Sequence, residues 1–270
     1  MKNNTSTIVA ATIAIVFLLM VIGSAPSSKP VAVPQVKASN YYYKPNIAAE
    51  KNNISLAIIN PAFAPSMSYP NSKLFTDFSA HMSEDIQQMA TANGYNIRGP
   101  FETVSSMVYN DKQACLLYLL PEINIGVDYS NLHIRNVTRT TGNAFNQQSY
   151  TVHYFEGSIV LEGRITMIFG ETFTKEKIQA ISIPLPKKYL NIASNYNYSS
   201  GVDFSQVLVN ALNAQRFKPD PGILNPIITA LEEYYIQAFQ TMQGQLDRKQ
   251  VELYQTDAEK VRKDANYFKQ

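Results

Sequence analysis

Few residues of this chain have the types and spacing that catalysis requires. The serines do not stand in a nucleophile elbow, and the chain contains no HExxH, no CxxC and no phosphate-binding glycine loop. Its carboxylates cluster at Glu232-Glu233 and in residues 171–176, which is more typical of solvated faces than of an acid/base pair. Three histidines lack the spacing of metal ligands: His81, His133 and His153. We therefore expect no catalytic residue, no metal and no cofactor, and we expect that the protein is not an enzyme.

The elements that would position a binding site follow an export segment. Residues 8–23 form an almost continuous apolar run after Lys2, and small residues and prolines come next. This order is typical of a secretory signal, and the run is also close to the length needed to span a bilayer. Residues 1–25 are thus either a signal peptide, cut near Ala25, or an N-terminal membrane anchor. Residues 26–53 are rich in proline and lysine, lack a period and predict an extended tether.

Composition limits the class of partner and the means of stabilisation. The chain has 270 residues and a formal net charge of +2, so nucleic acid is not expected as a partner. Cys115 is the one cysteine, and it lies in an apolar run. We expect it to be a buried thiol, and without an internal disulfide the exported domain must rely on its core.

Residues 54–270 predict a single α+β domain. Ser72 or Asn71 can cap a helix whose apolar face runs from Leu74 to Met89, and Gly94 suits its C-terminal end. Several short strands with turn residues between them predict an antiparallel meander, covered by the helices. The expected strands are 54–59, 94–98, 115–125, 132–140, 150–155, 158–169 and 180–185.

A long C-terminal helix is expected to begin at Asn225-Pro226, with Asn as N-cap and Pro in the first turn. Beyond Leu246 the sequence becomes charged, with a sparse apolar line that includes Leu253 and Val261. This tail predicts either a solvated helix or a surface for a partner helix.

The order of several short segments resembles the neuraminyllactose-binding haemagglutinin family of bacterial surface lipoproteins and adhesins. The resemblance extends over roughly residues 54–263. The segments that carry it are Asn60-Pro61-Ala62-Phe63, Asn93-Gly94-Tyr95, residues 155–160 and residues 252–259. It implies an exported surface protein that is lipidated at a cysteine and that binds sialic acid through a lysine-rich segment. In this chain Ser24 takes the place of the cysteine, and the matching region, residues 127–145, retains only Arg135 and Arg139 as cations.

Two functions follow as alternatives. The first is a structural or interaction subunit of an outer-membrane or secretion-system assembly, whose partners are envelope proteins and the membrane. The second is a surface adhesin for sialylated glycans, because arginine binds carboxylates in a bidentate geometry. Arg135 and Arg139 are its candidate ligand-binding residues, with these neighbours: Tyr129, Asn136 and Asn143. A periplasmic small-molecule binder stays open as well. In each case we expect an exported protein of the periplasm, the outer membrane or the cell surface.

Overall fold

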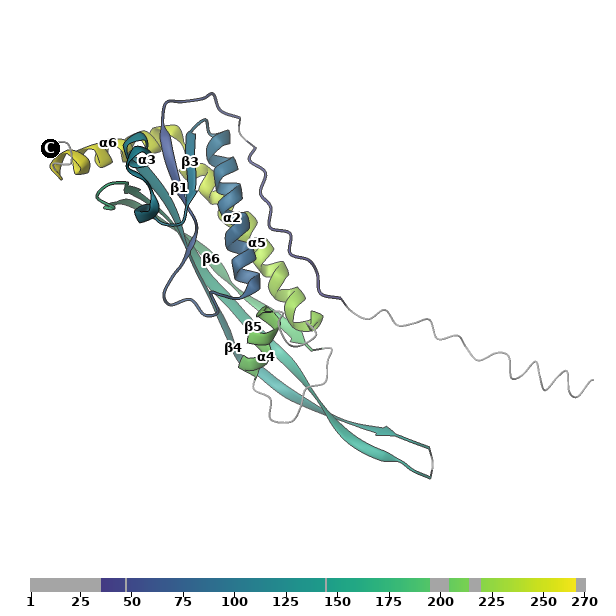
Figure 1. Cartoon of the computed structure of the whole chain (residues 1–270). Coiled ribbons are helices and arrows are strands. Elements are labelled where there is room, and N and C mark those ends of the chain that lie inside the picture. Colours follow the sequence, from purple (N-terminus) through teal and green to yellow (C-terminus); the bar gives the residue numbers. More distant parts are fainter. Residues whose placement is uncertain (1–34, 47, 144, 195–203, 214–219, 266–270) are drawn as a thin grey trace, which may run out of the picture. The chain divides into compact units, whose positions relative to one another are not determined.

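The computed structural model of the chain describes residues 35–46, 48–143, 145–194, 204–213 and 220–265 (Figure 1). These residues belong to one compact unit, Gln35–Gln270. The expected signal peptide or anchor, residues 1–25, and the tether as far as residue 34 lie outside the described residues. None of the helices in the described part of the chain is both long and apolar enough to cross a membrane.

The centre of the unit is a mixed sheet with the strand order β3-β1-β4-β5-β6, and β2 pairs with β4 beside β1. The strands are β1 (Ser55–Ile59), β2 (Ala62–Phe63), β3 (Asn96–Phe101), β4 (Leu117–Thr141), β5 (Gln148–Glu171) and β6 (Lys177–Ala193). The helices are α2 (Lys73–Ala92), α3 (Tyr109–Ala114), α4 (Phe204–Asn213), α5 (Pro221–Gln245) and α6 (Arg248–Asp264), with a short 3-10 helix η1 (Val104–Ser106). The α+β class is confirmed.

The expected meander consists of β4, β5 and β6, which are antiparallel neighbours. The pairings of β1 with β3 and with β4 are parallel. Because parallel neighbours need a crossover, the chain passes from β1 through α2 to reach β3. The expected strands 115–125 and 132–140 belong to one continuous strand, β4. Pro121 does not interrupt it, since it lies between Leu119 and Glu122, where β4 changes its parallel partner from β1 to β2.

Helix α2 has the boundaries that its sequence predicts. The Ser72 Oγ accepts a hydrogen bond from the backbone N–H of Phe75, which caps the helix. Gly94 follows its last turn with φ +83, and a Cβ at that position would lie 2.2 Å from the carbonyl oxygen of Glu50. The predicted apolar face is buried, with these residues among its members: Leu74, Phe75, Phe78, Met82, Ile86 and Met89.

The long C-terminal helix, α5, begins earlier than expected. Asp220 is its N-cap and accepts a hydrogen bond from the N–H of Gly222, and Pro221 occupies the first turn. The same cap-and-proline pattern therefore occurs five residues before Asn225-Pro226. Asn225 is inside the helix, where its Oδ1 accepts from the N–H of Lys37, so the prediction that it is the N-cap was wrong.

The charged tail forms a separate helix, α6, which starts at the N-cap Asp247. It packs on the domain through a face that the sequence did not reveal: Val251, Tyr254, Ala258 and Arg262. Leu253, which belonged to the expected apolar line, is 60% exposed. Arg262 and Glu171 form an ion pair that is almost fully buried, and the Arg262 Nη2 also donates to Thr172 Oγ1 at 2.9 Å.

Helices α2 and α5 lie side by side over one face of the sheet, and the chain before β1 runs along them (Figure 1). The described part of the expected tether, residues 35–46 and 48–53, is extended but packed. The ring of Tyr41 is buried 5.2 Å from that of Phe78 on α2 and 5.6 Å from that of Tyr235 on α5. The backbone N–H of Tyr43 donates to Asp85 at 2.6 Å. On the opposite face a smaller cluster includes Cys115 and Met107.

Candidate functional site

One candidate site lies on the end of the β4–β5 hairpin, which we call the distal ribbon: residues 131–141 of β4 and 148–158 of β5. A register shift between Asp128 and Asn131 marks its start, and only its base, through Leu132 and Phe155, still contacts the main core. The ribbon extends beyond the helices that cover the rest of the sheet (Figure 1). Among the described strands, β6 pairs with β5 only as far as Glu156–Ala193, and Phe155 next to it still exchanges hydrogen bonds with Ser194.

Both predicted site residues, Arg135 and Arg139, lie on one face of the distal ribbon. Directly opposite them on β5 are Tyr154 and Tyr150, and side chains of opposed residues point to the same face. The guanidinium carbons of Arg135 and Arg139 are 5.5 and 6.0 Å from the centre of the Tyr154 ring. The structure therefore brings the two arginines together around an aromatic residue that the sequence did not single out.

The two arginines differ in their partners. Arg135 Nε lies 2.7 Å from the carboxylate of Glu156, which is also 3.4 Å from His133 Nε2. Arg139 Nη2 donates a 2.8 Å hydrogen bond to the hydroxyl of Tyr154, which carries no charge. The charge of Arg135 is thus balanced within the ribbon, whereas that of Arg139 is available to an external anion. A guanidinium beside a tyrosine ring can bind a carboxylate or phosphate in a bidentate geometry.

The neighbours that the sequence suggested do not gather around the arginines. Asn136 lies on the opposite face, where its Oδ1 is 2.7 Å from His153 Nδ1. Tyr129 packs against Phe204 of α4, with ring centres 5.5 Å apart, at the base of the ribbon. Asn143 is in the turn, where its Oδ1 accepts hydrogen bonds from two backbone N–H groups.

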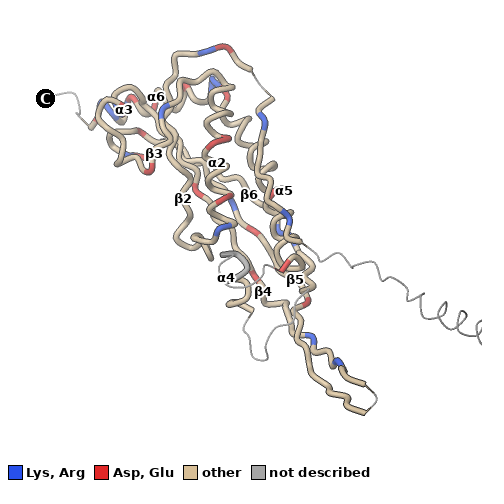
Figure 2. The backbone as a smooth tube through the Cα atoms, turned by 45° about the vertical axis from the view of Figure 1, so that its right-hand side comes forward, with Lys and Arg blue, Asp and Glu red and all other residues tan. Residues whose placement is uncertain are grey.

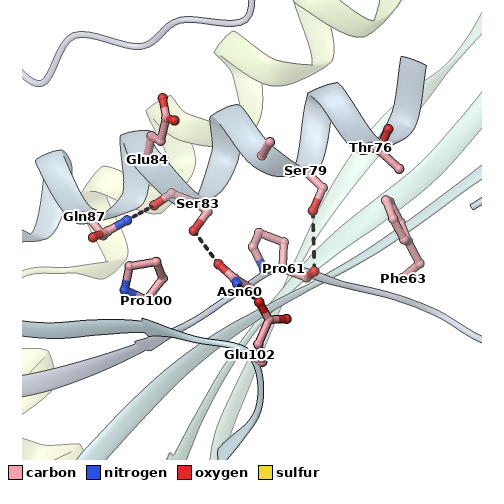
Figure 3. Close-up of a pocket in the computed structure, with 11 residues that line it drawn as sticks. Asn60, Pro61, Phe63, Thr76, Ser79, Ser83, Glu84, Gln87, Pro100 and Glu102 are labelled. Carbon is pink, nitrogen blue, oxygen red and sulfur yellow. Dashed lines mark hydrogen bonds between the residues drawn. The ribbon is translucent and has the colours of Figure 1, made fainter. Parts of the chain in front are cut away.

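A second candidate site is an open groove of about 430 Å³ between α2 and the ends of β1 and β3 (Figure 3). Asn60 follows β1 and Glu102 follows β3, and ligands often bind outside the carboxyl ends of parallel strands. Ser83 Oγ donates to Asn60 Oδ1 at 2.8 Å, and Asn60 Nδ2 lies 3.4 Å from Glu102 Oε1. Glu84 points away from these groups (Figure 3). The groove offers hydroxyl, amide and carboxylate groups to a small polar ligand.

The Cys115 thiol is buried and the Asp128 carboxylate is hydrogen-bonded. Burial raises the pKa of the Cys115 thiol to about 11, so the thiol stays protonated at neutral pH. The backbone N–H of Ser130 is the main cause of the lowered pKa of Asp128, at the base of the ribbon. The part of the chain that the structure describes contains no cluster of three or more His, Cys, Asp or Glu residues with the arrangement of a metal site.

Comparison with known proteins identifies the fold. No protein-family model and no curated protein sequence matches the chain. Among solved structures, a homologue of the neuraminyllactose-binding haemagglutinin from Helicobacter pylori is 13% identical, with a TM-score of 0.52 over 80% of this chain and 98% of that one. A DUF330 protein from Xanthomonas campestris is 9% identical, with a TM-score of 0.33 over 80% and 99% of the two chains. A lipoprotein from Neisseria meningitidis is 11% identical, with a TM-score of 0.25 over 58% and 94%.

The first of these likenesses extends over nearly the whole Helicobacter protein. At this identity it establishes a common fold, which agrees with the resemblance seen in the sequence and says nothing of shared ligands.

Proposed function

We propose that this chain is an exported, non-enzymatic protein of the bacterial cell envelope that acts by contact, and that the distal ribbon is its contact element. Envelope proteins and the membrane are its partners, and nucleic acid is not. Its place is the periplasm or the outer membrane and cell surface, either after cleavage of residues 1–25 or held by them. The structural neighbour described as a haemagglutinin homologue is consistent with this location.

The observation that carries the proposal is the distal ribbon itself. Phe155 at the base of the ribbon packs against Phe204 in the core, but a two-stranded hairpin beyond that point is only marginally stable in water and adds little to the core. Along residues 131–141 the outer edge of β4 pairs with no described strand, and a partner strand can add there. Most exposed side chains of the ribbon are polar, although Val152 and Phe155 are buried, and Arg139 carries a charge that no described carboxylate balances. These properties suit recognition better than stability.

The test is to copurify envelope partners with the intact chain and with a shortened variant. Deletion of residues 137–140 and 149–152 removes four cross-strand pairs and, because the number is even, keeps the remaining faces unchanged. We expect partners to copurify with the intact chain from detergent-solubilised envelopes, and we expect the variant to lose them while its thermal unfolding changes little. Tyr189→Ala, at an exposed residue of β6, is the control that should retain them. If the shortened variant recovered the same amount of partner proteins as the intact chain, the ribbon would not be the contact element.

A second candidate function, binding of sialylated glycans, is supported by the Arg139–Tyr154 geometry and by the description of the Helicobacter homologue. Titration calorimetry with sialyllactose, and with lactose as the control sugar, tests it. Arg139→Ala should abolish binding, whereas Arg135→Ala should weaken it less, because Arg135 already pairs with Glu156. An absence of heat at millimolar sialyllactose would remove this candidate.

A further inference from the structure

The tip of the distal ribbon presents a fully solvated aromatic side chain. Phe145 is 99% exposed, although an exposed phenylalanine gives up the free energy that its burial would contribute. Local hydrogen bonds fix the backbone that carries it: the Asn143 Oδ1 accepts from the N–H groups of Phe145 and Asn146, at 3.2 and 3.0 Å. Phe145 is therefore held at the end of the hairpin and away from the core.

The charges of the hairpin favour an anionic partner. No aspartate or glutamate occurs between Asp128 and Glu156, whereas this stretch contains Arg135 and Arg139. Figure 2 shows that basic residues are the charged residues beyond the base of the ribbon. Since Glu156 pairs with Arg135, the unbalanced charge nearest the tip is that of Arg139.

The order of side chains along the ribbon matches the depth profile of a lipid surface. Arg139 and Tyr150 oppose each other two residues before the paired strands end at Thr141 and Gln148. At about 3.3 Å per residue, they lie roughly 7 Å behind the last pair, with the Phe145 loop ahead of them. A bilayer interface takes an apolar aromatic group deepest, with tyrosine and arginine at headgroup level.

We infer that the ribbon tip binds an anionic lipid surface, with Phe145 inserted among the acyl chains and Arg139 against headgroup phosphates. This inference rests on the proposed role of the ribbon as the contact element and names its partner. A protein pocket for Phe145 is less favoured, because a binding hot spot is usually surrounded by contacts that exclude water. The residues that flank Phe145 at the tip are small or polar: Gly142, Asn143, Asn146, Gln147 and Gln148. Insertion of a side chain into a fluid layer does not require such surrounding contacts.

The chain contains no tryptophan, so the full-length Phe145→Trp variant carries a unique fluorescent reporter at the tip. Tyr189→Trp is the matched control, at a residue of β6 that is 67% exposed. With phosphatidylglycerol vesicles we expect the emission of the first variant to shift to shorter wavelength and to be quenched by brominated acyl chains. The control should show neither change. Because the reporter is local, the result does not depend on whether residues 8–23 also bind the vesicles.

Two further variants test the assigned roles. In the full-length Phe145→Trp chain, an added Arg139→Ala should weaken the fluorescence response to anionic vesicles about fivefold, in line with one lost cation at a charged surface. Phosphatidylcholine vesicles and free inorganic phosphate distinguish a lipid surface from phosphate binding alone. With a Tyr150→Trp reporter in the full-length chain, an added Phe145→Ala should weaken the fluorescence response to anionic vesicles about tenfold relative to an added Tyr189→Ala.

An unchanged tryptophan emission of the Phe145→Trp variant in the presence of anionic vesicles overturns the lipid inference. If copurification of envelope proteins still requires the ribbon, the proposed function survives that failure.

Discussion

Glu171 at the end of β5 and Arg262 in α6 are 91 residues apart in sequence and form a buried ion pair. The Arg262 Nε donates to Glu171 Oε1 at 2.6 Å, and the other carboxylate oxygen accepts from the backbone N–H groups of Phe173 and Thr174. The pair therefore fixes α6 to the sheet and leaves both charges satisfied.

The first prediction concerns this pair. Arg262→Ala leaves the carboxylate of Glu171 buried without its cation, and removal of one partner of such a pair typically costs about 3–5 kcal/mol of unfolding free energy. Urea unfolding monitored by circular dichroism measures it. Arg262→Met combined with Glu171→Gln should recover much of the loss, because neither charge is then buried. A loss below about 1 kcal/mol for Arg262→Ala would show that the ion pair does not hold α6.

The second prediction concerns Tyr41. Its hydroxyl is buried, and no described residue hydrogen-bonds to it. An unsatisfied buried polar group costs about 1–3 kcal/mol, so Tyr41→Phe should leave the unfolding free energy unchanged or raise it by about 1 kcal/mol. Tyr235→Phe is the contrasting variant, because the Tyr235 hydroxyl donates to Asp85 at 2.8 Å. Its loss should cost about 1.5–3 kcal/mol. If Tyr41→Phe lowered the melting temperature more than Tyr235→Phe does, this account would be contradicted.

Local sequence patterns were sufficient for α2 but not for the contacts of α6. The cap at Ser72, the apolar spacing and Gly94 all act within α2, so they predicted both of its ends. The buried face of α6 includes Arg262, whose burial depends on Glu171 of a distant strand. A pattern of apolar residues cannot predict that a charged residue such as Arg262 is buried. The apolar line through Leu253 therefore indicated a face of α6 that is in fact exposed.

The candidate site shows the same division between local and distant information. Arg135 and Arg139 could be chosen as cations in an otherwise uncharged stretch, and residues 142–148 as a turn. Counting outward from that turn would have placed Tyr154 opposite Arg135, but the register depends on which turn residues pair. The parallel pairings of β1 could not be read from its sequence alone, because a short continuous apolar run suits a parallel strand, a sandwich-core strand or a buried helix segment equally.

The third prediction concerns alkaline pH. Burial raises the pKa of Cys115 from 9.0 to about 11 and that of Tyr234 from 10.0 to about 12. Above pH 9 the unfolded chain releases these protons before the folded chain does, so the unfolding free energy should fall as pH rises. Cys115 alone accounts for a decrease of about 2 kcal/mol between about pH 9 and 11. Below that window these two groups should leave stability unchanged. In the Cys115→Ala variant the unfolding free energy should fall less steeply between about pH 9 and 11. An unchanged slope would show that Cys115 does not contribute to this pH dependence.

The fourth prediction compares two glycines. Gly142 has φ +109, and a Cβ there would lie 1.8 Å from the carbonyl oxygen of Asn146. Gly142→Ala should therefore distort the turn and weaken every interaction that depends on the ribbon tip, with little effect on the melting temperature of the domain. Gly244 lies in α5 with open space around its Cβ position, so Gly244→Ala should stabilise the helix by about 0.5–1 kcal/mol. Calorimetric melting together with the copurification assay separates the two effects.

The most direct test of the central claim is site-specific photo-crosslinking in intact cells. A photoreactive amino acid replaces Tyr150 on the distal ribbon in one strain and Tyr189 on β6 in another, since both side chains are exposed. If the ribbon is the contact element, irradiation should link position 150 to envelope components and leave position 189 largely unlinked. Crosslinks from position 189 without any from position 150 would contradict the account.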